Sequence, residues 1–410
     1  MKNILERFLD YVSYDTQSDG DSGTNPSTAK QLRLAAHLAE ELKELGLAEV
    51  TLTEKGYVYA KLPPSSGNGA VPALGFIAHM DTSSAASGAN VKAQIIRNWD
   101  GSPIPLGTSG IVLAPKPGLK GHTLITTDRT TLLGSDDKAG ITVIMTALER
   151  LLETGAPHGP LCIGFTPDEE IGRGADFFDV AFFGADYAYT VDGGAPELIE
   201  SENFNAARAV VKFKGLSVHP GSAKNVMINA QRAAMAFDAL LPAHEVPEET
   251  AMRQGFHHLT GSCGSVSAAE LRYIIRDHDR AVLERRKEDF RAAAAAIDRR
   301  YGPGTVTHTI TDEYRNMGEV LAKYPFLISC AEEAIRKAGL TPVRNPIRGG
   351  TDGARLSFMG LPCPNLGYGG YNAHGEREYA DADGMEQVVR IVLNIADAFT
   401  HLPAGTEKLR

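Results

Sequence analysis

The sequence predicts an α/β fold in which a mixed, mostly parallel sheet is covered by helices and interrupted by a smaller α+β domain. Apolar runs of strand length alternate with helical periodicity in the first and last parts of the chain. The middle of the chain follows a different order, strand, helix, strand and helix. With 410 residues, the chain is longer than one ordinary core requires, and it suits two domains.

The first part of the chain contains the predicted elements of the sheet domain. Leucines at helical spacing from Leu32 to Leu45 predict an amphipathic helix that Gly46 ends. Alternating runs at 50–52 and 58–62 predict a hairpin, and the continuous apolar run 73–78 predicts a strand buried on both faces. Further elements follow in α/β order: weak strands at 93–96 and 111–113 in a Gly- and Pro-rich stretch, a helix at 139–153, and strands at 161–165 and 187–191.

The middle part is expected to form a separate domain of the ferredoxin-like α+β type. Its predicted elements are strands at 209–214 and 271–276 and helices at 226–240 and 281–299. The α/β pattern returns near Val320, with helices that end at Ala338 and Phe399. We therefore expect a core domain made of 1–206 and 320–410, with an inserted domain at 207–319.

Composition excludes several classes of function. The formal net charge is -10, from 41 Lys plus Arg against 51 Asp plus Glu, and no basic run suits a nucleic acid. The four cysteines are scattered, which is typical of a reducing compartment. No apolar stretch is long enough to span a membrane, and charged residues interrupt the N-terminal apolar pattern. We expect a cytoplasmic protein that binds neither nucleic acid nor membrane.

Histidines and acids follow several of the predicted strands. His79 and Asp81 come at the end of the run 73–78, and side chains two apart on a strand share a side. Asp136 lies between a strand and a helix, where Asp is also a common helix cap. Each motif alone therefore has a structural alternative, either a helix cap or a histidine that hydrogen-bonds at a strand end.

Two further strand ends are more acidic. Glu169 and Glu170 follow the strand 161–165, Asp192 follows the strand 187–191, and His374 lies in a later loop after a glycine-rich stretch. Adjacent acids would repel one another unless a cation were bound, which lets one carboxylate ligate while its neighbour acts as a base. Because parallel strands end at one edge of a sheet, these side chains should meet there. Imidazole and carboxylate without thiolate suit a catalytic zinc site.

Together these motifs resemble the two-zinc aminopeptidase and carboxypeptidase superfamily. The motifs H-M-D, G-S-D-D-K-A-G, P-D-E-E-I-G, T-V-D-G-G and A-H-G-E stand in the order of that superfamily and at roughly its spacings. Segments 126–128, 218–225 and 348–353 are similar to its tripeptide aminopeptidases. The resemblance implies a hydrolase of the metallopeptidase class that removes the N-terminal residue from short peptides, preferentially tripeptides. The superfamily commonly has Gly in place of Arg129 and Ala in place of Ser135.

The resemblance also implies a set of metal ligands. Two Zn²⁺ ions per chain would be held by five residues, with a bridging carboxylate between them and a cis peptide bond after it. The bridging residue would be Asp136. The full set is His79, Asp136, Glu170, Asp192 and His374.

Other residues receive catalytic or substrate-binding roles from the same resemblance. Glu169 would be the general base, Asp81 would orient His79, and His219 of the inserted lid domain would reach the substrate oxyanion. Arg276 and Arg348 are two candidates for binding the carboxylate of the peptide, because a guanidinium can bind a carboxylate through two hydrogen bonds.

Two alternatives remain open. A dipeptidase, carboxypeptidase or N-acyl amino acid deacylase on the same scaffold would use the same metal chemistry. A non-catalytic, metal-dependent peptide-binding protein would belong to another class, and loss of Glu169 would have been its mark. Short peptides are the expected partners, and a second copy of the chain, in a homodimer, is a further candidate.

Overall fold

The computed structural model describes residues 2–402 and 406–407, and the chain divides into two compact units. Unit 1 comprises Met1–Ser201, Met317–Asn345 and Thr351–Arg410, and unit 2 comprises Glu202–Asn316 and Pro346–Gly350. The sequence placed the short segment Pro346–Gly350 in the core domain, and its grouping with unit 2 was not anticipated. Among the residues described, no helix is both long and apolar enough to cross a membrane.

An eight-stranded mixed sheet forms the centre of unit 1. Its strands, in spatial order, are β1 (Ala48–Leu52), β2 (Val58–Leu62), β8 (Leu161–Thr166), β3 (Leu74–His79), β9 (Tyr187–Gly193), β16 (Asn365–Gly367), β10 (Leu198–Glu200) and β15 (Val343–Arg344). The central strands β8, β3, β9 and β16 are parallel to one another. Every residue of β3 and β8 is buried, as expected for strands in a sheet covered on both faces. The predicted α/β class is confirmed.

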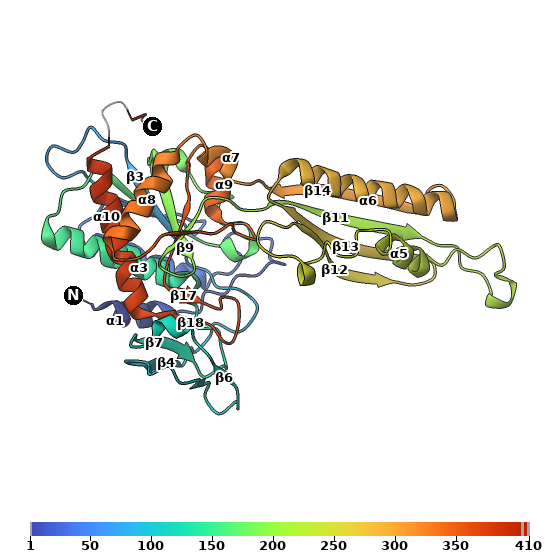
Figure 1. The fold of residues 1–410 in the computed structure, drawn as a ribbon, viewed down its shortest axis with the longest axis horizontal. Coiled ribbons are helices and arrows are strands. Elements are labelled where there is room, and N and C mark those ends of the chain that lie inside the picture. Colours follow the sequence, from blue (N-terminus) through green and yellow to red (C-terminus); the bar gives the residue numbers. More distant parts are fainter. Residues whose placement is uncertain (1, 403–405, 408–410) are drawn as a thin grey trace. The chain divides into compact units, whose positions relative to one another are not determined.

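Helices cover both faces of this sheet (Figure 1). On one face, α3 packs against β3 and α10, and an aromatic cluster that includes Tyr59, Phe178 and Phe183 lies on the other. Burying each such ring stabilises the fold by about 2 kcal/mol. The helices of unit 1 are α1 (Ile4–Val12), α2 (Gln31–Glu44), α3 (Ser135–Thr154), α4 (Val180–Phe183), α7 (Gly318–Leu321), α8 (Pro325–Lys337), α9 (Asp352–Phe358) and α10 (Ala382–Thr400).

Two small sheets in unit 1 account for the predicted Gly- and Pro-rich stretch. One contains β17 (Gly370–Tyr371), β18 (Tyr379–Asp381), β7 (Leu124–Thr127) and β4 (Ala93–Ile96), and the other pairs β5 (Ile104–Pro105) with β6 (Val112–Leu113). Strand β18 pairs antiparallel with β7, with Ala380 opposite Ile125. This pairing brings the segment between β7 and α3 near the loop that connects β17 to β18; α3 carries Asp136 at its start, and the loop carries His374.

Unit 2 is a ferredoxin-like β-α-β-β-α-β fold, as the sequence predicted. It contains β11 (Asn205–Lys214), α5 (Ala230–Asp238), β12 (Phe256–Gly264), β13 (Ala268–Asp277), α6 (Arg280–Tyr301) and β14 (Val306–Tyr314), with strand order β12-β13-β11-β14. Its core lies between one face of the sheet and the two helices (Figure 1). The sequence did not reveal β12 and β14, because both are edge strands whose mostly exposed residues lack apolar alternation.

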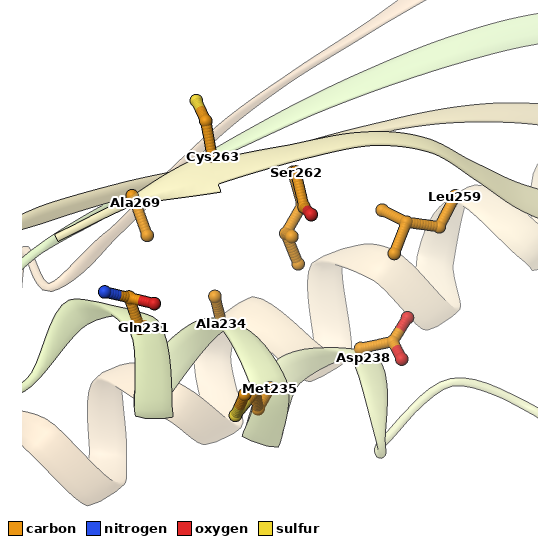
Figure 2. Close-up of a pocket in the computed structure, with 10 residues that line it drawn as sticks. Gln231, Ala234, Met235, Asp238, Leu259, Ser262, Cys263 and Ala269 are labelled. Atoms are coloured by element: carbon orange, nitrogen blue, oxygen red, sulfur yellow. The ribbon is translucent and has the colours of Figure 1, made fainter.

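A pocket of about 330 Å³ lies in unit 2 between α5 and the edge strand β12 (Figure 2). Apolar residues such as Met235 and Leu259 contribute to its lining. Its carboxylate, Asp238, accepts a hydrogen bond from the Tyr273 hydroxyl at 2.9 Å. No cluster of acids and histidines occurs among its lining residues, so this pocket does not match the predicted metal chemistry.

Candidate active site

The carboxyl ends of three adjacent parallel strands deliver the first site residues. Strand β3 ends at His79, Glu169 and Glu170 follow the end of β8, and Asp192 lies near the end of β9. Because β3 pairs in parallel with both β8 and β9, these ends lie at one edge of the sheet. The structure therefore brings together the strand-end residues that the sequence singled out.

Asp136 lies between two histidines. Its Oδ1 is 2.9 Å from Nε2 of His79, and its Oδ2 is 3.1 Å from Nε2 of His374. Asp136 and Asp137 interrupt the helical backbone at the start of α3, and the peptide bond between them is cis, as the resemblance implied. Since its two oxygens face different imidazoles, this carboxylate has the geometry of a bridging ligand.

Two further acids complete the two sets of donors. Nε2 of His79 is 3.4 Å from Oδ1 of Asp192, and Nε2 of His374 is 2.8 Å from Oε2 of Glu170. The other oxygen of Glu170, Oε1, is buried without a hydrogen-bond partner. A buried acceptor without a donor is costly unless a cation satisfies it. This orphaned oxygen, in a set made only of imidazole and carboxylate, fits a divalent metal site.

Asp137 is a rival ligand at the first set, because its carboxylate also lies near the imidazole of His79 and the carboxylate of Asp192. Both of its oxygens are already engaged, however. Oδ2 accepts from the backbone N–H of His79 at 3.2 Å, and Oδ1 accepts from that of Gly140 at 3.1 Å. Asp137 therefore holds the backbone of a ligand residue, and Asp136 remains the better ligand.

The pKa values of these groups reflect the excess of negative charge. Hydrogen bonds to Asp136 and Glu170 raise the pKa of His374 to about 11. Burial raises the pKa of Asp192 to about 7, and the nearby charges of Asp136 and Glu170 add to the effect. For Asp136, burial opposes ionisation, but hydrogen bonds from His374 and His79 hold its pKa well below the usual range. The cluster therefore retains protons that a bound cation would displace.

Asp81 and Glu169 lie beside these donor sets. Nδ1 of His79 donates a hydrogen bond to the backbone carbonyl of Asp81 at 3.0 Å and also lies 3.4 Å from Oδ1 of the Asp81 carboxylate. The Asp81 carboxylate is fully buried and accepts from the backbone N–H groups of Glu169 at 2.9 Å and Glu170 at 3.2 Å. Burial, together with the charge of Asp192, raises the pKa of Glu169 well above its usual value. A carboxyl with that tuning suits a general base.

Asp168 anchors the segment that carries Glu169 and Glu170. It adopts a left-handed backbone conformation with φ 59°, and its buried carboxylate turns toward the N-terminal segment. That carboxylate accepts hydrogen bonds from Ser27 N at 2.7 Å, Ser27 Oγ at 2.5 Å and Gln31 Nε2 at 2.7 Å. In the sequence, Asp168 stands out only as the Asp of the motif P-D-E-E-I-G, since its donors lie far away in the chain.

The predicted residues of the inserted domain lie in unit 2. His219 is exposed, and its Nδ1 accepts a hydrogen bond from the Gly221 N–H at 3.1 Å. Arg276 is largely buried and forms an ion pair with Glu313 at 3.1 Å. Arg348, expected in the core domain, belongs instead to a segment grouped with unit 2. The catalytic role of His219 and the clamp role of either arginine stay predictions.

Hydrogen bonds fix the guanidinium of Arg348, and none of the described residues gives it an acidic partner. Nη1 donates to the carbonyls of Met252 at 2.9 Å and Gln254 at 2.8 Å, and Nη2 donates to the Thr250 hydroxyl at 2.9 Å. The group also stacks over Phe204, 5.2 Å from the ring centre. Every hydrogen bond that Arg348 makes in the described structure goes to a neutral oxygen, so its charge has no partner there.

Comparison with known proteins identifies the family. The model of peptidase family M20/M25/M40 matches residues 134–398, more than half of the chain. The chain belongs to this family. It is 52% identical to peptidase T of Clostridium perfringens over 401 residues, which cover 96% of this chain and 98% of that one. The expected hydrolase of the metallopeptidase class is thereby confirmed.

Two solved structures have the same fold as this chain. An aminopeptidase PepT from Bacillus cereus superposes with a TM-score of 0.78 at 21% identity, covering 97% of this chain and 98% of that one. A tripeptidase from Staphylococcus aureus gives a TM-score of 0.77 at 20% identity, covering 98% of each chain. These matches extend over both units, so the core and the inserted domain both belong to the shared architecture.

A buried acid lies behind Asp192. The Asn365 side chain accepts from the Asp192 N–H at 3.1 Å and donates to Oε2 of Glu200 at 2.8 Å. Burial raises the pKa of Glu200 from the usual 4.5 to about 7, although the hydrogen bond from Asn365 opposes this shift. The folded protein therefore binds this proton more tightly than the unfolded chain does, and stability from Glu200 falls as the pH rises from 4.5 to 7.

We predict that Glu200→Gln removes the loss of folding stability that ionisation of Glu200 causes as the pH rises. At pH 4 the metal-free variant and the wild type should have similar free energies of unfolding in urea. At pH 8 the variant should be more stable by about 3 kcal/mol, because it has no carboxyl to ionise. Glu202→Gln is the control, since a hydrogen bond from Arg253 lowers the pKa of Glu202 and no such gain is expected. Equal pH profiles for Glu200→Gln and wild type would contradict the prediction.

Proposed function

We propose that this chain is a two-metal aminopeptidase that removes the N-terminal residue from short peptides, with tripeptides preferred. One observation carries the proposal: the two oxygens of Asp136 face the imidazoles of His79 and His374, and each imidazole is joined by a further carboxylate. The unpartnered Oε1 of Glu170 supports a cation at the second set. Zinc is the proposed metal because all donors are imidazole or carboxylate.

In hydrolysis, the two donor sets would hold the cations, and the neighbouring acid, Glu169, would transfer the proton. When bound, a pair of divalent cations would polarise the scissile carbonyl and lower the pKa of a water molecule. Glu169 belongs to neither donor set, and Asp81 fixes its backbone, so its carboxyl remains available for proton transfer. Glu169 takes the proton from the attacking water and delivers it to the nitrogen of the leaving amine.

Recognition of the peptide is assigned to charge at its two ends. Carboxylates at the site that are not required to hold the cations can bind the N-terminal ammonium group of the peptide. For the C-terminal carboxylate, Arg348 is the better of the two candidates, because among the described residues its charge has no acidic partner, whereas that of Arg276 is paired with Glu313. His219 is proposed to contact the oxyanion of the substrate. A cytoplasmic location and a homodimer stay predictions.

We predict that the enzyme measures peptide length. An extended peptide advances about 3.6 Å per residue, so fixing both charged ends selects one length. After chelation and restoration of zinc, kcat/KM should be highest for tripeptides, lower for dipeptides and tetrapeptides, and lowest for N-acetylated tripeptides. Mass spectrometry of the products should show release of the N-terminal residue. Release of the C-terminal residue, or equal turnover of acetylated peptides, would favour a carboxypeptidase or deacylase instead.

Removing the proposed base should separate catalysis from metal binding. Glu169→Gln is expected to lower kcat by about a hundredfold or more, because general acid–base catalysis contributes at least that much. Metal content measured by elemental analysis should stay unchanged, since Glu169 is outside both donor sets. Near-normal turnover by a variant with its full metal content would rule out the assigned role.

The proposed carboxylate anchor can be tested against a neighbouring arginine. Arg348→Met should lower kcat/KM for tripeptides about tenfold or more and flatten the length preference, since a charged partner of the substrate is lost. Arg253→Met is the matched control, because Arg253 is exposed and already paired with Glu202 at 2.7 Å. The wild type should prefer free tripeptides over tripeptide amides, which lack the C-terminal charge. If Arg348→Met keeps the same preference, another residue binds the carboxylate.

A further inference from the structure

Glu378 is a buried acid outside both donor sets, and it receives four hydrogen bonds. It is only 2% exposed and lies in the loop between β17 and β18, four positions after His374. Its donors come from one continuous segment, 133–136, at the start of α3. Oε2 accepts from Leu133 N at 2.9 Å and Gly134 N at 2.8 Å, and Oε1 accepts from Ser135 Oγ at 2.7 Å and Asp136 N at 3.0 Å.

The donors form a binding site for an anion that is built largely from backbone. Gly134 has φ 77°, a left-handed conformation that glycine adopts without strain, and the N–H groups of Leu133, Gly134 and Asp136 all face Glu378. Gly134 also precedes α3 without any side-chain cap of its own. The first N–H groups of a helix lack partners within the helix. Glu378 therefore acts as a cap supplied by a distant segment.

This cap joins two segments that each carry a proposed metal ligand. One end of the contact is the backbone N–H of Asp136, and the other is the loop of His374. The backbone of Glu378 is held as well, because its carbonyl accepts from the Thr126 hydroxyl at 2.8 Å. Asp136 Oδ2 and His374 Nε2, which lie 3.1 Å apart, are thus positioned by a contact that uses no ligand atom.

We propose that Glu378 is a positioning residue that sets the separation of Asp136 and His374, and so the affinity for the cation those two residues share with Glu170. The inference rests on the proposed two-metal function and names a residue through which that site is held. Residues that fix ligands from outside the coordination sphere typically change metal affinity ten- to a hundredfold when replaced. The cation held by His79 and Asp192 should be affected less, since Asp137 independently holds the His79 backbone.

Substitutions can separate this role from simple packing. Glu378→Gln keeps the shape of the side chain but replaces one acceptor oxygen with an NH₂ group. In either orientation of the amide, this NH₂ faces a backbone N–H from which it cannot accept, either that of Asp136 or those of Leu133 and Gly134. Ser135→Ala removes one donor and leaves the other three. Glu376→Gln is the matched control, because Glu376 lies in the same loop but is exposed and pairs with Arg129 at 2.7 Å.

The experiment is a titration of metal-free protein with Zn²⁺ against a chromophoric chelator. His374→Ala identifies which binding step belongs to the second cation. Glu378→Gln should weaken that step about ten- to a hundredfold, Ser135→Ala should weaken it a few-fold, and Glu376→Gln should leave it unchanged. Excess zinc should restore most of the kcat of Glu378→Gln, which a lasting structural defect would not allow.

The outcomes that overturn the proposal are distinct from those that overturn the function. If folded Glu378→Gln binds both ions with wild-type affinity, or only its melting temperature in the metal-free state falls, Glu378 has no positioning role. If circular dichroism shows that Glu378→Gln is unfolded, Ser135→Ala decides by the same titration. If the wild type binds only one ion, the two-metal function fails, while the affinity of that ion in the variants still tests Glu378.

Discussion

The carboxylate of Asp136 is the group on which the rest of the site depends. It must lie close to both His79 and His374, which come from distant parts of the chain, and close to the carboxylates of Asp192 and Glu170. Like charges this close repel strongly, because a buried site screens them poorly. The segments that bear the ligands must therefore be held together by contacts that do not use the ligand atoms.

The fold meets this requirement with a second group of acids that bind backbone N–H groups. Asp137 holds the backbone of His79, Asp81 holds Glu169 and Glu170, Asp168 ties the same segment to Ser27 and Gln31, and Glu378 holds the turn before Asp136. A carboxylate that accepts several N–H groups is stabilised without a counter-ion. Many of the carboxylates in the motifs thus hold the backbone in place, and the remaining ones are available to bind cations.

The sequence predicted where the site forms better than it predicted which atoms form it. Strand ends 79, 166 and 193 could be placed together because parallel strands of a covered sheet share an edge. The resemblance gave Asp81 the role of orienting His79. Nδ1 of His79 lies 3.0 Å from the backbone carbonyl of Asp81 and 3.4 Å from Oδ1 of its carboxylate, two acceptors that the H-x-D spacing does not distinguish, and the role stays a prediction. Glu378 left no signal because most of its donors are backbone groups. Strands β12 and β14 were missed because edge strands need no apolar alternation.

Two arginines of the same unit show why charge partners also escape sequence analysis. Arg276 and Arg348 were equal candidates in the sequence, but the fold gives Arg276 a carboxylate and gives Arg348 only neutral oxygens and aromatic rings. A guanidinium fixed in place without a counter-ion loses little entropy on binding an anion. In the proposed function, bond cleavage is assigned to residues of unit 1, and recognition of the peptide carboxylate is assigned to a residue grouped with unit 2. Such a division lets one metal-binding scaffold serve peptidases of different specificity, because the inserted unit can change while the donor sets stay the same.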